Sequence, residues 1–582
     1  MARYYGIDLG TTNTVVYEGA FQLPMDEEGE EEMTYSCVPK AFRSDVSNTI
    51  SGLSMPSVLC IKNDPQDPTK KKMLVGVDAE SNAGKGRNDA IFLMNTKRFT
   101  GRKDKFEGGY TALDVAVAFL DKCAEAIDQK RKVDKKKICV THPASYNIFA
   151  SVDTKRAAVQ AGFKNVSVLE EPRAALLSFL YDRVENPDMR EELFRKQEEK
   201  GGSLTVLVVD IGGGTTDVTV QTFRIRERRQ DEEKDAIIFS DFFVEFMNRD
   251  AKDDQRHSQS NNYHCFGGMD FDLLAMKHLM LMVEKEYEKE TGMSIEDMAA
   301  NDYEGICGIV MRQAEEYKKK LSKVSREDLD EYEGPIHVAK LYGDYSMDIR
   351  LKGCDYVAWV ADLCDNTADA DCDAQLSVFG IVRETLRKSG YVLNDLSYVF
   401  VTGGMSQYLP IRYMLEEKFS GSDIEVCFST IPTDDVARGA ALFGNYFNLE
   451  MPATVLNTNY YLDNPCGEPF LLAKEGTMLP LQTQVKENFL EVTNPVEVVV
   501  SILSGDGPYS TNLRCLTHRK AELIYPDYRG TPIDVRYSIS DDQQLSMDLI
   551  VHHKNKEDEV ISVYDVEMKG ETDGKRVYER GN

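Results

Sequence analysis

The chain has 582 residues, and at roughly 100–200 residues per domain this length predicts more than one folding unit. It carries 69 Lys and Arg against 98 Asp and Glu, a net charge of −29, so its overall field disfavours nucleic-acid backbones and anionic membranes as partners. No run of about 18 consecutive apolar residues occurs, which argues against a membrane-spanning helix.

Cysteine usage and the first residues bear on the compartment. The sequence has 12 cysteines, none of them in a C-x-x-C pair, and only 8 histidines. This argues against a zinc site or a disulfide framework and favours a reducing compartment. Residues 1–6 (MARYYG) lead directly into strand-like sequence, so we expect no signal peptide. These observations predict a cytoplasmic protein.

Residues 1–450 alternate between strand-like and helical patterns. Strand-like runs bounded by Gly or Pro lie at 4–9, 137–141, 204–211 and 398–402. Apolar residues recur at helical spacing in 111–130, 151–162, 270–291 and 304–325. Alternation of this kind predicts an α/β architecture.

Three polar stretches interrupt the alternation. Residues 26–32 (DEEGEEE) and 362–373 (DLCDNTADADCD) are strongly acidic, and residues 224–262 are polar and irregular. Because charge runs are usually solvated faces, we interpret all three as surface insertions.

The pattern changes after Pro452. Short, often alternating segments lie at 496–503, 533–538 and 545–551, separated by turn residues such as 504–508 (SGDGP). We therefore predict an antiparallel β-sandwich over 457–582. A linker at 448–456 would join it to an α/β domain over 1–447.

A local repeat carries the strongest chemical signal. Residues 6–13 read GIDLGTTN and residues 209–217 read VDIGGGTTD, within expected hairpins at 6–17 and 206–223. A strand that ends in a carboxylate can position Mg²⁺ or a water. Glycines let backbone N–H groups approach phosphate oxygens, and threonine hydroxyls add donors. Two copies predict two pseudo-equivalent lobes that face a common cleft.

A third element ends in paired glycines. Residues 399–404 (VFVTGG) form an expected buried strand, before a helix expected at about 410–419. Glycines at the carboxyl end of a strand leave room for a base or ribose against the backbone, the usual ligand position in open α/β sheets. We therefore expect adenosine to lie here.

These three motifs, in this order, resemble those of the actin-like ATPase fold and, within it, of the 70-kDa heat-shock (DnaK-like) chaperone family. Four further segments are similar to family motifs: 170–175 (EEPRAA) to N-E-P-T-A-A, 266–272 (FGGMDFD) to L-G-G-E-D-F-D, 314–322 (AEEYKKKLS) to the helix that grips adenosine, and 140–144 (VTHPA) to V-T-V-P-A. The resemblance spans most of 1–447. It implies duplicated ribonuclease H-like lobes, followed by a peptide-binding β-sandwich.

The resemblance also implies ATP or ADP with Mg²⁺ as ligands. It implies that Asp8, Glu171 and Asp210 organise Mg²⁺, largely through water, and that these three and Thr215 are catalytic. It implies nucleotide contacts by Gly10, Thr11, Thr12, Asn13, Gly212, Gly213, Gly214, Thr215, Gly267, Gly268, Glu315, Lys318, Ser322, Gly403, Gly404 and Met405. Hydrolysis in such a site proceeds by positioning and electrostatics rather than covalent chemistry.

One departure from the family pattern concerns a lysine near the γ-phosphate, expected in a V-G-x-x-A-K segment. Residues 75–80 read VGVDAE, so Glu80 stands at the lysine position, and the Lys97-Arg98 pair follows where the family has its own Lys-Arg. A carboxylate about 4 Å from a phosphate charge costs roughly 4 kcal/mol at an effective dielectric constant of about 20. That cost would slow phosphoryl transfer by up to about three orders of magnitude.

Three other departures are smaller. Gln407 stands where the family usually has an arginine that stacks on adenine, and it supplies no cation. Residues 449–456 (LEMPATVL) lack the family's acidic-flanked leucine run, which predicts weaker or different coupling between domains. No helical lid is expected after the β-sandwich, so a peptide groove there should exchange ligand quickly.

The leading hypothesis is a chaperone-like protein that couples ATP binding and slow hydrolysis to binding of peptide or unfolded segments by the β domain. Co-chaperones are expected as further partners, but nucleic acid and membranes are not. The alternative is a nucleotide-binding regulator or scaffold with little ATPase activity, because Glu80 replaces the lysine. A small-molecule kinase lacks a recognisable substrate motif, and a filament-forming cytoskeletal relative leaves the β domain unexplained.

Overall fold

The structure, a computed structural model, describes most of the chain. The described residues are 2–21, 34–64, 70–81, 90–102, 104–144, 146–232, 235–247, 261–264, 266–295, 303–342, 345–366, 376–451, 456, 458–464, 467–510, 513–524, 529–540, 545–564 and 577–578. The acidic stretch at 26–32 and residues 367–373 of the second stretch lie outside these ranges.

The first lobe is built on a mixed sheet. Across it run β11 (Asn165–Glu170), β10 (Lys137–His142), β1 (Ala2–Leu9), β2 (Asn13–Phe21) and β3 (Tyr35–Pro39), with β6 (Ser54–Pro56) also pairing with β2. β11, β10 and β1 are parallel to one another, whereas β2 is antiparallel to β1 and to β3. Helices α2 (Ala112–Ile127) and α3 (Ile148–Gln160) pack apolar residues against this sheet.

The second lobe repeats this arrangement. Across its sheet run β19 (Glu425–Phe428), β18 (Tyr398–Thr402), β12 (Leu204–Ile211), β13 (Thr216–Glu227), β14 (Phe242–Met247) and β20 (Asn448–Glu450), with β15 (Asn261–His264) also pairing with β13. The first five strands have the order and the directions of the five in the first lobe. The structure therefore confirms the predicted duplicated, two-lobed α/β fold.

Two helices, α4 (Glu171–Glu185) and α12 (Asp435–Asn445), join the lobes where glycine permits close packing. A Cβ added at Gly439 of α12 would lie 1.7 Å from the Ala174 carbonyl oxygen of α4. A Cβ added at Gly6 of β1 would lie 2.1 Å from the Ala437 carbonyl oxygen. Because no larger residue fits at these positions, α12 lies against both the first sheet and α4.

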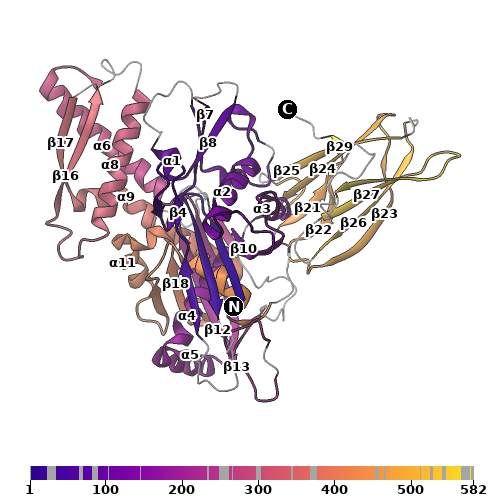
Figure 1. The fold of residues 1–582 in the computed structure, drawn as a ribbon, viewed down its shortest axis with the longest axis horizontal. Helices are drawn as coiled ribbons and strands as arrows, with labels where there is room; N and C mark the ends of the chain where they lie inside the picture. Colours follow the sequence, from indigo (N-terminus) through magenta and orange to yellow (C-terminus); the bar gives the residue numbers. More distant parts are fainter. Residues whose placement is uncertain are drawn as a thin grey trace.

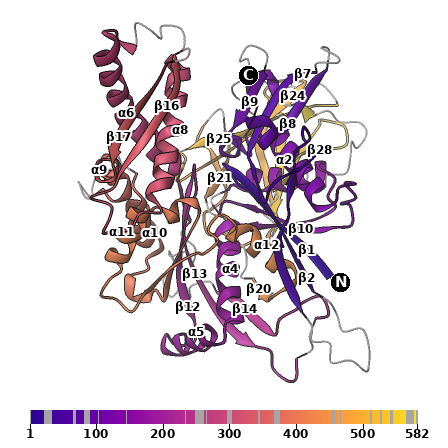
Figure 2. The same cartoon turned by 60° about the vertical axis from the view of Figure 1, so that its left-hand side comes forward.

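Each lobe carries a different addition. Figure 2 shows the addition of the second lobe at the upper left and that of the first lobe at the upper right. The first lobe has the sheet β8 (Lys71–Val75), β7 (Val58–Asn63) and β9 (Ala90–Met94), together with the hairpin β4 (Phe42–Arg43) and β5 (Ile50–Gly52) and with α1 (Val77–Glu80). The second has the hairpin β16 (Glu333–Tyr342) and β17 (Tyr345–Lys352), with α6 (Gly268–Thr291), α8 (Tyr303–Leu321) and α9 (Gly353–Cys364).

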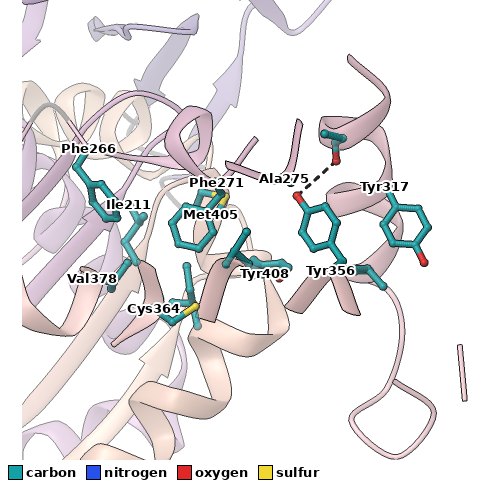
Figure 3. Packing of buried hydrophobic residues seen from close by; sticks show 14 of the residues in the cluster. Ile211, Phe266, Phe271, Ala275, Tyr317, Tyr356, Cys364, Val378, Met405 and Tyr408 are labelled. Carbon is teal, nitrogen blue, oxygen red and sulfur yellow. Dashed lines mark hydrogen bonds between the residues drawn. The ribbon is translucent and has the colours of Figure 1, made fainter. Parts of the chain in front are cut away.

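The core of the second lobe extends into its addition. Figure 3 shows Phe271 of α6 beside Met405 and Tyr408, with Tyr356 and Tyr317 farther along the same cluster. Helices α10 (Val378–Ser389) and α11 (Leu409–Lys418) close the cluster from the sheet side. The lobes also contain helix α5 (Pro187–Glu199), which packs beside α4.

The C-terminal domain consists of two packed sheets, at the right of Figure 1. One sheet has the order β22 (Phe470–Ala473), β21 (Asn459–Leu462), β24 (Glu497–Gly505), β25 (Arg514–Glu522) and β29 (Val577–Tyr578). The other has the order β23 (Leu481–Glu491), β26 (Pro532–Ile539), β27 (Leu545–Val551) and β28 (Glu559–Tyr564). Burial alternates along β26 and β27, as one inner face requires, so the expected antiparallel β-sandwich is confirmed.

Two expectations about irregular segments need correction. The stretch at 224–262 contains β14 and β15 and the end of β13, because apolar residues such as Phe242, Val244 and Phe246 alternate into the core. Residues 448–450 of the predicted linker form β20, which pairs in parallel with β14. Of the rest of that linker, residues 452–455 lie outside the described residues.

Candidate functional site

The turn of the first hairpin is held by a serine from a neighbouring loop. The Ser57 hydroxyl donates to the Gly10 carbonyl oxygen over 2.7 Å, and the Ser57 N–H donates to the Thr12 carbonyl oxygen over 2.8 Å. A 3.0 Å hydrogen bond joins the Ser57 and Thr14 hydroxyls. With its carbonyls occupied in this way, the turn is held with Thr11 and Thr12 between β1 and β2.

The turn of the second hairpin is held by the start of α6. The N–H groups of Gly268 and Met269 donate to the carbonyls of Gly212 and Gly213 over 3.0 and 2.6 Å. The hydroxyl of Thr216, which is fully buried, donates to the Phe266 carbonyl over 2.8 Å. The first N–H groups of α6 thus bind the carbonyls of the glycine turn and fix the turn in place.

The two turns lie against each other. A Cβ added at Gly213 would lie 2.5 Å from Thr12 Oγ1, and one added at Gly214 would lie 3.2 Å from Thr11 Cγ2. Arg98 also crosses between the lobes, because its guanidinium donates to the Gly214 carbonyl. The residues predicted to hold phosphates are therefore neighbours in space, although about 200 positions separate them in sequence.

A buried lysine lies among the predicted Mg²⁺-organising carboxylates. Lys97 belongs to the 3₁₀ turn η2 (Thr96–Phe99), and its Nζ is 2.5 Å from Glu171 Oε1. Burial alone would lower the pKa of Lys97, but the carboxylates of Glu171 and Asp8 outweigh it and raise that pKa above its usual range. The ammonium group therefore stays charged and pairs with the buried Glu171 carboxylate.

The carboxyl groups around Lys97 resist ionisation in the absence of further cations. Burial raises the pKa of Asp8 to about 7, with Lys97 opposing and Glu171 adding to the rise. Burial, then Glu171, also raises the pKa values of Asp210 and Asp217 well above the usual range. A site with several such carboxyls beside a single lysine favours a bound cation.

Glu80 does not lie where the sequence placed it. It ends α1, at the edge of the three-stranded sheet, and its side chain is exposed. Burial raises the pKa of Glu80, Glu315 raises it further and Lys319 lowers it, so its charged neighbours belong to α8. The lysine beside the predicted Mg²⁺-organising carboxylates is Lys97, which reaches them from η2, after β9. It belongs to the Lys-Arg pair that the family also has, so it does not replace the family's other lysine, at whose sequence position Glu80 stands.

A second buried pair lies at the start of α6 and on α8. Lys318 Nζ donates to Asp272 Oδ2 over 2.7 Å and to the Gly268 carbonyl over 3.0 Å. The Met405 side chain packs beside Gly268 and is buried in the core of the second lobe (Figure 3). Met405 therefore has only its backbone available for the predicted nucleotide contact.

Gly403 is fitted closely to the second hairpin. Its φ is +80°, and a Cβ added there would lie 2.3 Å from Asp210 Oδ1, whereas nothing lies within 4 Å of one added at Gly404. One strand residue earlier, the Thr402 hydroxyl donates to Asp435 Oδ2 over 2.6 Å. Gly403 thus has to be glycine for Asp210 to keep its place, whereas Gly404 faces open space.

The remaining predicted contacts lie at the edge of this arrangement. Asn13 begins β2 and is exposed. Glu315 pairs with Lys319 over 2.7 Å on the exposed side of α8, and the Ser322 hydroxyl donates to the Lys318 carbonyl of its own helix. The second turn is closed by a 2.8 Å hydrogen bond between the Gly212 N–H and the Thr215 carbonyl.

The residues present fit a nucleotide with Mg²⁺. Two buried polar atoms without a hydrogen-bond partner in the described part of the chain belong to this region, Arg98 Nε and Asp272 Oδ1. Across the described residues, no three His, Cys, Asp or Glu side chains converge closely enough to ligate a metal directly. Mg²⁺ usually keeps several waters and takes one or two carboxylates plus phosphate oxygens, so the donor set suits an ion held largely through water.

A short segment joins this region to the β-sandwich. The Tyr146 hydroxyl donates to the Lys97 carbonyl over 2.9 Å, and His142 stacks on the Tyr146 ring. Two residues later the Ile148 N–H donates to the Tyr460 hydroxyl oxygen over 3.2 Å. The Ile148 side chain is 1% exposed and belongs to the apolar core of the β-sandwich, and Figure 1 shows α3 beside that domain.

Sequence reasoning missed several residues of this site. The Lys-Arg pair that contains Lys97 was used only to align the sequence with the family pattern, and no role in the site was predicted for Lys97. Asp217 closes the quoted motif of the second hairpin, opposite Asp210 in the strand register, and that position could have identified it. Ser57 and Tyr146 contribute hydrogen bonds between segments that are distant in sequence, and no local sequence pattern predicts such contacts.

Within the described residues, no helix combines the length and the apolar character needed to cross a bilayer.

Comparisons with known proteins give a consistent result. A family model described as Hsp70 protein matches residues 4–227. A heat shock cognate HSP70 protein of Trypanosoma brucei brucei is 23% identical over 590 aligned residues, covering 92% of this chain and 73% of the relative. A chaperone protein DnaK of Methanothermobacter thermautotrophicus is 24% identical over 555 residues, covering 92% of this chain and 76% of the relative.

Proposed function

We propose that this chain is a chaperone of the Hsp70 family that couples ATP binding and slow hydrolysis to binding of peptide or unfolded segments by its β-sandwich; the family model over residues 4–227 and the two relatives support this proposal. Members of this family bind nucleotide and are ATPases, so nucleotide binding, turnover and coupling in this chain are all parts of the proposal. Co-chaperones and a cytoplasmic site of action are part of the proposal.

The observation that carries the ATPase proposal is Lys97 among the carboxylates. Its ammonium lies 2.5 Å from Glu171 Oε1 and next to the two phosphate turns, where a fixed positive charge stabilises the charge that develops during phosphoryl transfer. The Thr11 and Thr12 hydroxyls and the amides of 212–214 would hold the phosphates.

The carboxylates complete the proposed mechanism. Mg²⁺, when bound, neutralises phosphate charge and orients the transferred group. Asp8, Asp210 and Glu171 would hold it through water, and they would position the attacking water.

The coupling proposal rests on the segment at 146–149. Tyr146 holds the backbone of Lys97, and Ile148 is inserted in the core of the β-sandwich. A shift of Lys97 on nucleotide binding would move Tyr146 and, two residues on, the contact with Tyr460. Linkage requires the β-sandwich to have different peptide affinities in the two nucleotide states.

Two measurements test the ATPase proposal. Isothermal titration should detect binding of ATP and ADP with Mg²⁺, and single-turnover phosphate release should exceed the uncatalysed rate and respond to added unfolded peptide. Failure to bind either nucleotide would overturn the whole proposal, whereas binding without hydrolysis would leave a nucleotide-dependent binding protein.

Coupling is tested with a matched pair of tyrosine variants. Tyr460→Phe removes the hydroxyl that accepts from Ile148, and Tyr537→Phe removes one that donates to the Leu472 carbonyl inside the sandwich. We expect Tyr460→Phe to reduce the effect of ATP on peptide affinity and Tyr537→Phe to leave that effect intact. Equal effects of the two variants contradict the proposed route.

The alternative of a regulator with little turnover depended on Glu80 standing in place of the lysine. Glu80 is exposed on α1 and Lys97 lies beside Glu171, but Glu80 still stands at the sequence position of the family's other lysine, so single-turnover phosphate release decides between the alternative and hydrolysis. Nothing in the described cleft favours the kinase or filament hypotheses either.

A further inference from the structure

Arg98 is a cation of the first lobe that reaches the glycine turn of the second lobe. It follows Lys97 in η2, and its Nη2 group donates to the Gly214 carbonyl oxygen. A Cβ added at Gly214 would lie 3.0 Å from Arg98 Nη2 and 3.2 Å from Thr11 Cγ2. The guanidinium group therefore lies where the two phosphate turns meet.

The charge of Arg98 has no counter-ion in the described part of the chain. No carboxylate there forms an ion pair with it, whereas its neighbour Lys97 pairs with Glu171. Among the described residues, the Gly214 carbonyl is its one hydrogen-bond acceptor. The Nε atom is buried and has no hydrogen-bond partner there. Because an arginine has five N–H donors, most of this donor set is unused.

A half-buried guanidinium group with a buried, unpaired Nε–H favours binding of an anion. The cost of removing a charge from water is offset only by an opposite charge or by a full set of hydrogen bonds. The Gly214 carbonyl supplies one hydrogen bond and no net charge. An anion with several oxygen acceptors supplies both, and a phosphate group matches the planar fork of arginine.

The position of Arg98 relates it to one end of the nucleotide. Lys97, the residue before it, contacts Glu171, which we expect to help organise Mg²⁺ and the attacking water. The terminal phosphate is the group that reacts, so it has to lie next to these residues. The predicted adenosine contacts belong instead to α8 and to the turn after β18, in the second lobe. Of the three phosphates of ATP, the terminal one is therefore expected beside Arg98.

We propose that Arg98 binds the terminal phosphate of ATP and makes the cleft discriminate ATP from ADP. This inference rests on the proposed binding of nucleotide in the cleft. The unpaired N–H groups of Arg98, Nε–H among them, donate to oxygens of that phosphate, while Nη2 keeps its hydrogen bond to the Gly214 carbonyl. ADP lacks the terminal phosphate, so its affinity gains little from Arg98.

The test compares the affinities of the full chain for ADP and for a non-hydrolysable ATP analogue, each with Mg²⁺, by isothermal titration. Arg98→Met removes the charge and keeps an unbranched side chain. We expect it to weaken the ATP analogue about 10- to 100-fold, which corresponds to loss of hydrogen bonds to a charged group, and to weaken ADP less than about threefold. An equal loss for both nucleotides, or no loss for either, overturns the inference.

Two further variants control for charge and for folding. Arg102→Met is the matched control, because Arg102 follows η2, is exposed and lies over the Phe99 ring. It should leave the ratio of ATP-analogue to ADP affinity unchanged, and a change as large as that of Arg98→Met contradicts a direct contact. Arg98→Lys keeps the charge without the planar fork, so we expect an intermediate ratio. It also takes the place of Arg98→Met if that variant fails to fold.

The parent chain separates this inference from the proposed function. If the parent binds neither nucleotide, the proposed function itself fails. If the parent binds both and the Arg98 variants leave the ratio of the two affinities unchanged, only the role of Arg98 fails. Melting curves recorded without nucleotide show whether each variant is folded.

Discussion

The two lobes share a strand order and directions but hold their phosphate turns differently. In the first lobe Ser57 holds the turn, with its hydroxyl donating to the Gly10 carbonyl and its backbone N–H donating to the Thr12 carbonyl. In the second lobe the backbone at the start of α6 holds it. The first lobe also supplies the cations Lys97 and Arg98. Duplication preserved the sheet, whereas the two turns took on different chemistry.

The largest expected effect comes from removing the positive charge that the first lobe supplies to the site. Lys97→Met should reduce single-turnover phosphate release by about 10²- to 10³-fold, because a preorganised charge at the developing negative charge is lost. Nucleotide titration and unfolding of the variant separate loss of chemistry from loss of fold. Glu80→Lys is the matched control and should leave turnover unchanged. A rise in turnover with Glu80→Lys would restore the original placement of Glu80.

The next effect concerns the second lobe. Gly403→Ala should lower the free energy of unfolding by about 2–4 kcal/mol, because φ is +80° and the new Cβ would clash with Asp210. Denaturant titration measures the loss, and ATP affinity should fall with it. Gly404→Ala is the control and should change the free energy of unfolding by less than about 0.5 kcal/mol. Equal losses in both variants would contradict the packing described at Gly403.

A smaller pair of effects compares the two turns directly. Ser57→Ala removes a hydrogen bond to the first turn, and Thr216→Val removes one from the second lobe to Phe266, each worth about 1–2 kcal/mol. We expect Ser57→Ala to weaken ATP binding more than Thr216→Val does, because Ser57 bonds directly to the turn. Calorimetric affinities and melting curves of both variants decide this. The reverse order would mean that the backbone, not Ser57, fixes the first turn.

The smallest effect lies in the β-sandwich. His552 lies between Asp534 and Asp558, at 2.9 and 3.1 Å, and the hydrogen bond to Asp534 raises its pKa although burial lowers it. The charged histidine therefore stabilises the fold below its unfolded pKa, and this contribution is lost as pH rises through its folded pKa. His552→Gln should cost about 0.2–1 kcal/mol at pH 5.5 and nothing at pH 9. Urea unfolding at both pH values measures it, and equal losses would contradict an ionic contribution.

Local patterns predicted much of the fold. The strand at 398–402 has the predicted bounds, and both hairpins lie where the repeat put them, because apolar runs and glycine turns are local signals. What failed depended on distant contacts. Only the three-dimensional path of the chain through α1 and β9 shows that Lys97, and not Glu80, lies beside Glu171.

The place of Ile148 in the core of the β-sandwich has a consequence for folding order. Its contact with Tyr460 joins residues 312 positions apart, and the domain that receives it is synthesised after both lobes. Domains generally fold as units during synthesis, N-terminal first. The first lobe is therefore in place before the β-sandwich emerges, and it presents a preformed apolar plug on which the later strands assemble.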